Sequence, residues 1–259
     1  MRTPLVIGNW KMHGTLAEAR TLATGIRDGL KRVRGVEVVL CPPFTALAAV
    51  AEVLAGGTVH LGAQNCHHEA AGAHTGEVAP PMLTDLGCRY VLLGHSERRR
   101  EFGESDEQVN RKVHAALAGG LVPVLCVGET AEERRQGLTY TTVEGQLRAG
   151  LLGIPAGRLA RAVLAYEPVW GIGTGVNATP AQAAEVHGYL RGLVSELASK
   201  EVAQTIRILY GGSVKADNAD ALVAEPEIDG ALVGGASLSA QGFIAVVKKA
   251  ARGGAAARE

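Results

Sequence analysis

The chain has 259 residues, of which 47% are hydrophobic, 20% charged and 4% aromatic. Its 26 lysines and arginines balance its 26 aspartates and glutamates, so the formal net charge is zero and offers no electrostatic footprint for nucleic acid or an anionic membrane. Any anionic ligand must therefore be held by local groups. The length fits one domain, because single α/β barrels commonly reach about 250 residues.

The four cysteines, Cys41, Cys66, Cys88 and Cys126, are scattered and form no CxxC pair. In a chain of this size that spacing indicates reduced thiols and no disulfide framework. The first residues, MRTPLVIGNW, hold an apolar run too short for the core of a signal peptide, and no later stretch is long enough to span a bilayer. We therefore expect a cytoplasmic protein.

Short apolar runs recur along the chain, and most lack polar alternation, as is typical of parallel strands covered on both faces. Eight are predicted as strands: LVIG from Leu5, VEVVL from Val36, VHLGA from Val59, YVLLG from Tyr90, LVPVLCVG from Leu121, RAVLAY from Arg161, IRILYGG from Ile206 and GALVGG from Gly230. Their starts lie roughly 30 residues apart, about the size of one βα unit.

Stretches with helical spacing separate these runs. The first helix is predicted in TLAEARTLATGIRDGLKRV, where one face carries Leu16, Ala19, Leu22, Ala23, Ile26 and Leu30. A later one, TPAQAAEVHGYLRGLVSELASK, opens with Thr179 as its predicted N-cap and Pro180 at the first helical position. The low-complexity tail is expected to fray from about residue 252.

Eight such units without a linker favour a closed (β/α)8 barrel that forms a single domain over residues 1–259. A doubly wound sheet also fits the alternation, but it would not need eight evenly placed strands in so short a chain. In barrels of this kind the chemistry lies at the carboxyl ends of the strands. The sequence places most of its unusual polar residues and paired glycines there: Asn9, Lys11, Gln64, Asn65, His95, Ser96, Glu97, Cys126, Glu129, Glu167, Ser213, Gly234 and Gly235.

Each of these residues has an ordinary interpretation by itself. Glu167 could be a solvated glutamate, His95 a structural histidine and Lys11 a surface lysine. Together they predict one site, in which a carboxylate, an imidazole and an ammonium surround a glycine-lined pocket. Main-chain amides there could hold a phosphate, aided by a short helix after the eighth strand, at Gly173, Ser213, Gly234 and Gly235.

Three other motifs lead elsewhere. GIGTG half-resembles a dinucleotide fingerprint, but it does not open directly into a helix, so we predict no nucleotide. The segment CHHE at residues 66–69 offers metal-type ligands, but adjacent histidines on a loop splay apart, so we expect a polar loop and no metal. The three arginines at 98–100 could clamp a phosphate. Their neighbours Glu97, Glu101 and Glu104 favour a charge network that pins the loop.

At these residues the chain closely resembles the triosephosphate isomerase family, over essentially its whole length. The matching segments occur in the family's order: GNWKM, GAQN, HTGEV, GHSERR, CVGE, AYEPVWGIGTG, YGGSV and LVGGASL. The resemblance implies a TIM barrel that interconverts dihydroxyacetone phosphate and D-glyceraldehyde 3-phosphate through an enediolate, in glycolysis and gluconeogenesis. It implies no cofactor.

The resemblance also implies a role for each matching residue. Glu167 becomes the base, a neutral His95 the electrophile and Lys11 the electrostatic stabiliser, a pattern established for that family. Asn9 and Lys11 contact the substrate, and a glycine-rich lid at residues 168–178 covers a phosphate held by Gly173, Ser213, Gly234 and Gly235. Supporting roles fall to Ser96, Glu97, Cys126 and Tyr210.

The family forms homodimers, so the resemblance implies a second copy of this chain as partner. The loop around Thr75 is then expected to reach into the partner's site, with Gln64, Asn65 and His74 at the interface. The sequence departs from the usual family pattern at His13, at His74 and at the far hinge of the lid, where it reads Val176, Asn177 and Ala178.

Two other functions stay open at this point. One is a Schiff-base aldolase or lyase that uses Lys11. That chemistry needs a neutral, desolvated lysine, whereas Lys11 lies beside the polar Asn9. The other is an inactive phosphate-binding barrel, which the joint presence of Glu167, His95 and Lys11 disfavours.

Overall fold

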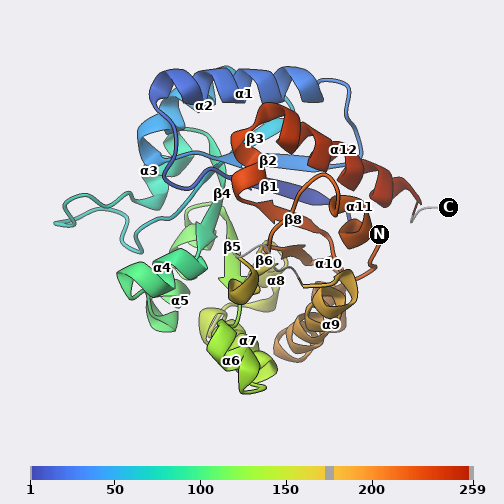
Figure 1. Cartoon of the computed structure of the whole chain (residues 1–259). Coiled ribbons are helices and arrows are strands. Elements are labelled where there is room, and N and C mark those ends of the chain that lie inside the picture. The colour runs from blue at the N-terminus through green and yellow to red at the C-terminus, as the bar shows by residue number, and fades with distance from the viewer. Residues whose placement is uncertain (1, 173–177, 257–259) are drawn as a thin grey trace.

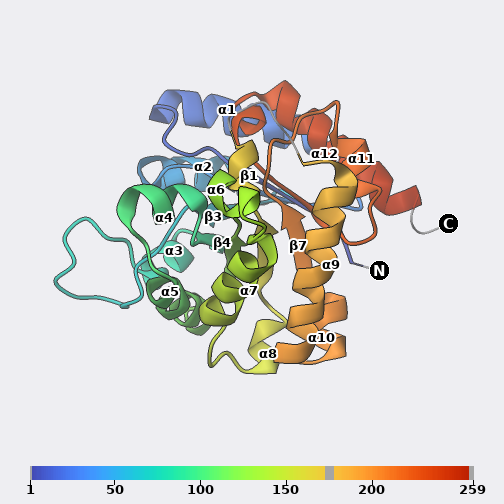
Figure 2. The same cartoon turned by 60° about the horizontal axis from the view of Figure 1, so that its bottom comes forward.

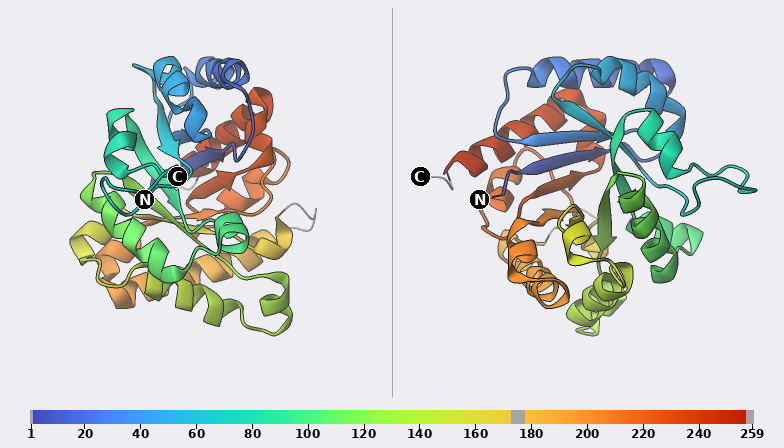
Figure 3. Two further views of the ribbon diagram at one scale, coloured as in Figure 1. Left: turned by 90° about the vertical axis from the view of Figure 1, so that its left-hand side faces the viewer. Right: turned by 180° about the vertical axis from the view of Figure 1, so that it is seen from behind.

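The computed structural model describes residues 2–172 and 178–256. In these residues the strands pair in parallel and in chain order, and the last strand pairs with the first to close a barrel. Helices cover the outside of this barrel in every direction (Figures 1, 2 and 3). The closed barrel confirms the predicted (β/α)8 fold and rules out the doubly wound alternative.

All eight predicted strands are present, with ends shifted by a few residues at most. RAVLAY, for example, begins its strand two residues later than predicted. The strands are β1 Leu5–Asn9, β2 Glu37–Cys41, β3 Val59–Ala63, β4 Cys88–Leu93, β5 Val122–Val127, β6 Val163–Tyr166, β7 Arg207–Tyr210 and β8 Gly230–Val233.

The α-helices of the described residues are α1 Leu16–Leu30, α2 Leu47–Leu54, α3 Pro80–Asp85, α4 Ser96–Phe102, α5 Asp106–Ala118, α6 Ala131–Arg135, α7 Thr139–Gly150, α8 Ala156–Leu159, α9 Pro180–Leu197, α10 Lys200–Thr205, α11 Ala219–Val223 and α12 Ala240–Ala256. Short 3₁₀ turns lie at η1 Phe44–Ala46, η2 Val169–Gly171 and η3 Gly235–Leu238. Thr179 caps α9 as predicted, since its side chain accepts a hydrogen bond from the N–H of Gln182.

The predicted apolar face of α1 is buried at Ala19, Ala23, Ile26 and Leu30. The prediction is wrong for Leu16, whose side chain is 54% exposed. Its spacing continues the stripe, but Leu16 is the first helical residue and no part of the described core covers that end of the helix. At the other end of the chain, α12 continues as far as Ala256, within the expected tail, and residues 257–259 lie outside the described part.

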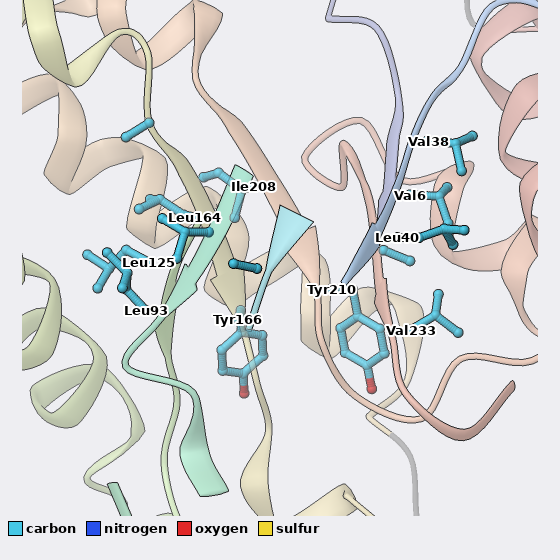
Figure 4. Close-up of a cluster of buried hydrophobic side chains, with 14 of the residues drawn as sticks. Val6, Val38, Leu40, Leu93, Leu125, Leu164, Tyr166, Ile208, Tyr210 and Val233 are labelled. Carbon is cyan, nitrogen blue, oxygen red and sulfur yellow. The ribbon is translucent and has the colours of Figure 1, made fainter. Parts of the chain in front are cut away.

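Side chains alternate along each strand between two apolar layers. On β6, Val163 and Ala165 point into the barrel, whereas Leu164 and Tyr166 point outward to the helices. Figure 4 shows this outer layer, with Tyr166 among the labelled residues. The alternation matters for the site, because it fixes which residue at each strand end faces the mouth of the barrel.

The segment between β3 and α3, residues 64–79, projects away from the barrel (Figures 1 and 2). It carries the exposed residues His74 and Thr75. Across the described part of the chain, none of the helices combines the length and apolar character needed to span a membrane.

Candidate active site

Alternation along the strands brings the candidate residues to one place. Ile7 on β1 and Ala165 on β6 face the barrel interior, so Asn9 and Glu167, each two positions later, take the same face at the carboxyl end. On β8, Leu232 is followed in the same way by Gly234. Glu167 directly follows β6, so the strand places its carboxylate over the mouth of the barrel.

A cavity of about 550 Å³ opens at this end. Its walls combine predicted site residues with others that the sequence did not single out: Asn9, Lys11, His95, Glu167, Ile172, Gly211, Gly212, Ser213, Val214, Lys215, Ala216, Leu232, Gly234, Gly235, Ala236 and Gly242. The predicted site is thus brought together. The sequence missed apolar wall residues such as Val214 and Leu232, because nothing in an apolar side chain marks it as part of a wall before the fold is known.

Glu167 is 2% exposed and has two close partners. Its Oε1 lies 2.9 Å from Nε2 of His95, and its Oε2 accepts the main-chain N–H of Ser96 at 2.9 Å. Burial alone would raise the pKa of Glu167, but the neighbouring His95 and the Ser96 N–H outweigh it and hold that pKa below the ordinary value. The carboxylate is therefore kept ionised in a buried position.

His95 lies two residues after the end of β4 and caps α4, and this position fixes its tautomer. Its Nδ1 accepts the main-chain N–H of Glu97 at 3.2 Å, so the proton of the neutral ring lies on Nε2, which faces Glu167 and lies 3.3 Å from Nδ2 of Asn9. Burial lowers the pKa of His95, and the charge of Glu167, together with its hydrogen bond, raises it above the ordinary value. The residues directly after His95 form α4, and His95 is its N-cap.

Lys11 is held in an unusual backbone conformation. Its φ is +52°, and it is the one non-glycine residue with positive φ in the described part of the chain. The side-chain oxygen of Asn9 accepts the N–H of Lys11 at 3.0 Å, and Gln64 donates to its carbonyl at 2.7 Å. Its ammonium group forms an ion pair with Glu97 at 2.5 Å. Such strain, of order 1–3 kcal/mol, persists only where neighbours enforce the conformation.

The glycine-rich part of the cavity comes from the ends of β7 and β8. A Cβ atom at Gly211 would lie 2.8 Å from Cγ of Glu167, so a side chain there would press on the carboxylate. Ser213 is partly exposed beside it, and the short turn η3 begins at Gly235, next to the half-buried Gly234. Gly173, Val176 and Asn177 lie outside the described residues, and Ala178 is buried.

The supporting residues surround this centre. Ser96 contacts Glu167 through its hydroxyl at 3.4 Å as well as through its N–H. Cys126 is fully buried inside the barrel, and burial raises the pKa of its thiol well above the usual range. Tyr210 lies in the outer layer, where burial raises its pKa to about 12.

A fully buried carboxylate at Glu129 anchors the segment that follows Glu167. Trp170 donates its indole N–H to Glu129 at 2.9 Å, the Tyr166 hydroxyl donates at 3.0 Å, and the guanidinium of Arg134 lies 4.2 Å above the Trp170 ring. The sequence placed Glu129 at a strand end but did not include it among the site residues. The available signal was that Glu129 lies at the end of the same predicted strand as Cys126. Its burial could not be predicted from the sequence.

The residues expected at a subunit interface are of two kinds. His74 and Thr75 are exposed on the projecting segment. Gln64 and Asn65 point into their own chain: Gln64 bonds the main chain of Lys11, and Asn65 is 4% exposed and accepts a hydrogen bond from Lys112 at 2.9 Å.

The predicted charge network around the three arginines is confirmed in part. Arg98 pairs with Glu104 at 3.3 Å and Arg100 with Glu101 at 2.6 Å, while Arg99 pairs with Asp106 at 2.5 Å. Glu97 takes no part in it, because its carboxylate pairs with Lys11 across the site.

The expectation that adjacent histidines of the CHHE loop splay apart is wrong, because their rings lie against each other. The centroid of His67 lies 4.3 Å from that of His68 and 4.1 Å from that of His74. Within residues 2–172 and 178–256, no group of three or more His, Cys, Asp or Glu side chains is arranged to hold a metal ion.

A carboxylate, an imidazole and an ammonium around one cavity, at the carboxyl end of a closed (β/α)8 barrel, define an acid–base enzyme of the TIM-barrel class. The profile of the family Triosephosphate isomerase matches residues 4–250. A curated triosephosphate isomerase of Chloroflexus aurantiacus is 56% identical over 95% of this chain and 99% of its own length. Another from Roseiflexus is 55% identical over 95% of this chain and 97% of its own length.

Among solved structures, the crystal structure of triosephosphate isomerase from Bartonella henselae matches with a TM-score of 0.86 at 40% identity, over 95% of this chain and 98% of that chain. The chain therefore belongs to the triosephosphate isomerase family. Membership makes it an isomerase, as the sequence predicted.

Proposed function

We propose that Glu167, His95, Lys11 and Asn9 carry out the triose-phosphate interconversion that belongs to the family of this chain. One observation supports this most strongly: the Glu167 carboxylate and the Nε2 atom of His95 lie 2.9 Å apart in one wall of the cavity. A base for a carbon acid and a donor for the neighbouring oxygen must be this close, because the two positions they serve are on adjacent substrate atoms.

In the proposed reaction, Glu167 takes a proton from C1 of dihydroxyacetone phosphate. The electron pair of that C–H bond forms the C1–C2 double bond, and the carbonyl oxygen gains the charge. His95 passes its Nε2 proton to that oxygen and recovers one from the hydroxyl at C1. Glu167 then returns its proton to C2, which gives D-glyceraldehyde 3-phosphate and restores both side chains.

His95 works in this scheme as a neutral ring. Its second proton would have to go to Nδ1, which already accepts the N–H of Glu97 at the start of α4. The Glu167 carboxylate is the main group that raises the pKa of His95 against the effect of burial, and Glu97 contributes less. Once Glu167 has taken the substrate proton it is neutral, and this effect is lost. The imidazole is then a matched donor for the enediolate.

Lys11 and the glycine-rich loops supply the remaining binding groups. The Lys11 ammonium is placed to offset charge on the enediolate, and two unit charges about 4 Å apart interact by about 4 kcal/mol at an effective dielectric of about 20. Main-chain N–H groups near Ser213, Gly234 and Gly235, with Gly173 in the lid, would hold the phosphate. Asn9 orients Lys11 by accepting its N–H at 3.0 Å, and its Nδ2 lies 3.3 Å from Nε2 of His95.

We also propose that the chain works as a homodimer in the cytoplasm, each copy one domain over residues 1–259. Large apolar side chains support the dimer: Met12, in the loop that carries Lys11, is 93% exposed, and Phe102 at the end of α4 is 68% exposed. Thr75, on the projecting segment, would reach the partner's site. Reduced thiols fit the proposed compartment, because all four cysteines are free and buried.

The test is a coupled assay with D-glyceraldehyde 3-phosphate on the wild-type protein and on Glu167→Gln. We expect turnover by the wild type and its loss in the variant. A wild-type protein without activity would support the inactive barrel. Borohydride treatment in the presence of substrate separates the remaining alternative, since an adduct at Lys11 would indicate Schiff-base chemistry and we expect none.

A further inference from the structure

Glu167 lies in the walls of two cavities. Besides the substrate cavity, a second space of about 260 Å³ has Glu167 in its wall, together with residues that include Ser96, Gly128, Gln146 and Val169. Of the residues that the structure describes, Glu167 alone lines both. With open space on either side, the position of this residue depends on what holds its main chain.

The end of β5 provides that support. The N–H of Glu167 donates to the carbonyl of Val127 at 2.8 Å, and the N–H of Val169 donates to the carbonyl of Glu129 at 3.1 Å. The β5–β6 pairing thus continues past the end of the strand and carries both the proposed base and the start of the lid. Between these two bonds lies Gly128.

Gly128 is in direct backbone contact with Glu167. A Cβ atom at this position would lie 1.7 Å from the carbonyl oxygen of Glu167, 2.7 Å from its carbonyl carbon and 3.2 Å from its Cα. The φ of Gly128 is not positive, so glycine is required here by the close approach and not by backbone conformation. Any shift of the Gly128 peptide is therefore passed to the main chain of Glu167.

A single side chain holds that peptide in place. Gln146 on α7 accepts the Gly128 N–H with its Oε1 at 2.8 Å and donates its Nε2 to the Gly128 carbonyl at 3.3 Å. One amide thus binds both polar groups of the glycine, and it reaches across from a helix that packs on β5. The side chain is partly buried and does not line the substrate cavity.

We propose that Gln146 is a positioning residue for the isomerase reaction: by fixing the Gly128 peptide, it sets where Glu167 and the base of the lid stand relative to the substrate. This rests on the proposed role of Glu167 as the base. Because a displacement of about 1 Å can cost about 100-fold in rate, a smaller shift of Glu167 is expected to cost about tenfold.

The experiment compares Gln146→Leu, which removes both hydrogen bonds, with Asn110→Leu. Asn110 is a matched control on α5: its side-chain amide also holds two main-chain carbonyls, those of Gly150 at 3.1 Å and Leu152 at 2.9 Å, but it has no contact with Glu167. Both variants should lower Tm. In Gln146→Leu we expect kcat to fall about tenfold with KM changed less than threefold. In Asn110→Leu both constants should stay near wild type.

Gln146→Glu keeps the acceptor for the Gly128 N–H and loses the donor, so its kcat should lie between those of wild type and Gln146→Leu. It also serves if the leucine variant does not fold. A kcat within twofold of wild type in a folded Gln146 variant, with Tm lowered, would overturn the proposal and leave a structural role only.

Measuring Glu167→Gln in the same experiment separates a failure of the proposed base from a failure of the positioning role of Gln146. If it keeps full activity, the base has been assigned wrongly. If it is inactive while the folded Gln146 variants are fully active, the role of Glu167 stands and the positioning role fails.

Discussion

Glu167 stands at the carboxyl end of the barrel interior and Glu37 at its amino end, and the pKa of each lies below the ordinary value although burial would raise it. At the amino end the hydrogen bonds to the carboxylate come from a tyrosine hydroxyl and a guanidinium, while Nε2 of His60 and the guanidinium of Arg89 lie further away, at 3.5 and 3.6 Å from Oε1 of Glu37. Tyr90 donates to Oε1 of Glu37 at 2.6 Å, Arg207 donates to Oε2 at 2.5 Å, and Arg207 also bonds the Tyr90 hydroxyl at 3.0 Å.

At the carboxyl end the partners are different. Glu167 faces a histidine that can give up a proton and a single main-chain N–H, and it opens onto a cavity of about 550 Å³. The direction of the pKa shift is the same at both ends, so it does not separate Glu167, the proposed base, from Glu37. The two carboxylates are distinguished by the identity of their partners and by the cavity beside Glu167.

Removing the charge at the carboxyl end should have the largest effect. Glu167→Gln is expected to lower kcat by about 10²- to 10⁴-fold, because general base catalysis contributes about that much. Glu167→Asp, which withdraws the carboxylate by about 1 Å, should cost about 100-fold. Steady-state kinetics measures both, and affinity for a phosphate-bearing analogue should change far less. Full kcat in the Asp variant would mean that another group is the base.

The neighbouring cation comes next. Lys11→Met keeps the unbranched stem and removes the ammonium that pairs with Glu97. If half of a charge interaction of about 4 kcal/mol is lost, both kcat/KM and the Kd of a phosphate-bearing enediolate analogue should worsen by more than tenfold. The net charge of the chain is zero, so no general attraction for anions replaces it. Near wild-type values of both kcat/KM and this Kd would show that Lys11 has no role in the reaction.

The amino end should respond in stability and not in rate. In Glu37→Gln, Arg207 loses its carboxylate, and the unfolding free energy is expected to fall by about 2 kcal/mol while kcat stays within twofold of wild type. The folded pKa of Glu37 is lowered, so its contribution is present above pH 4.5 and is lost as pH falls through the folded pKa. Denaturant unfolding at pH 7 and pH 3 checks this. A tenfold loss of kcat would contradict the division between the ends.

The sequence predicted the carboxyl end well because strand alternation and chain order suffice for it. Asn9 and Glu167 each follow an inward residue by two positions, so counting along a strand places them. The side-chain hydrogen bonds that support the site from outside the cavity could not be predicted in the same way. Gln146 meets Gly128 across 18 residues and Lys112 meets Asn65 across 47, and nothing local in either segment marks these pairs.

The same limit applies to burial. Glu129 directly follows a predicted strand and Glu37 is the second residue of another, and a glutamate at a strand end is usually solvated. Only the packing of Tyr166 and Trp170 around Glu129, and of Tyr90 and Arg207 around Glu37, makes these carboxylates part of the interior. The resemblance to the family supplied roles for matching residues, but it did not supply these contacts.

A third buried titratable group lies between the two ends, in the outer layer. His187 on α9 is fully buried, with Nδ1 3.2 Å from the carbonyl of Glu227 and its ring edge-on to Tyr166, and burial lowers its pKa to about 3. A histidine that stays neutral when folded stabilises the fold fully above pH 6.5 and progressively less below it, by about 1.4 kcal/mol per pH unit. His187→Gln should lose this slope between pH 6.5 and 5 in chemical unfolding. An unchanged slope would show that another group causes the acid sensitivity.

The smallest effect is expected on the projecting segment, which carries the exposed His74. Its ring stacks on His67, which stacks on His68, and burial together with the charge of His67 lowers the pKa of His68. Imidazoles gain charge at mildly acidic pH, and like charges about 4 Å apart in water repel by about 1 kcal/mol. If this segment forms the proposed dimer interface, the dimer Kd should rise about fivefold between pH 7.5 and 5.5. In His74→Phe the ring remains but cannot charge, so the rise measured by analytical ultracentrifugation should be smaller. An equal rise in both proteins would show that the stack does not respond to pH through His74.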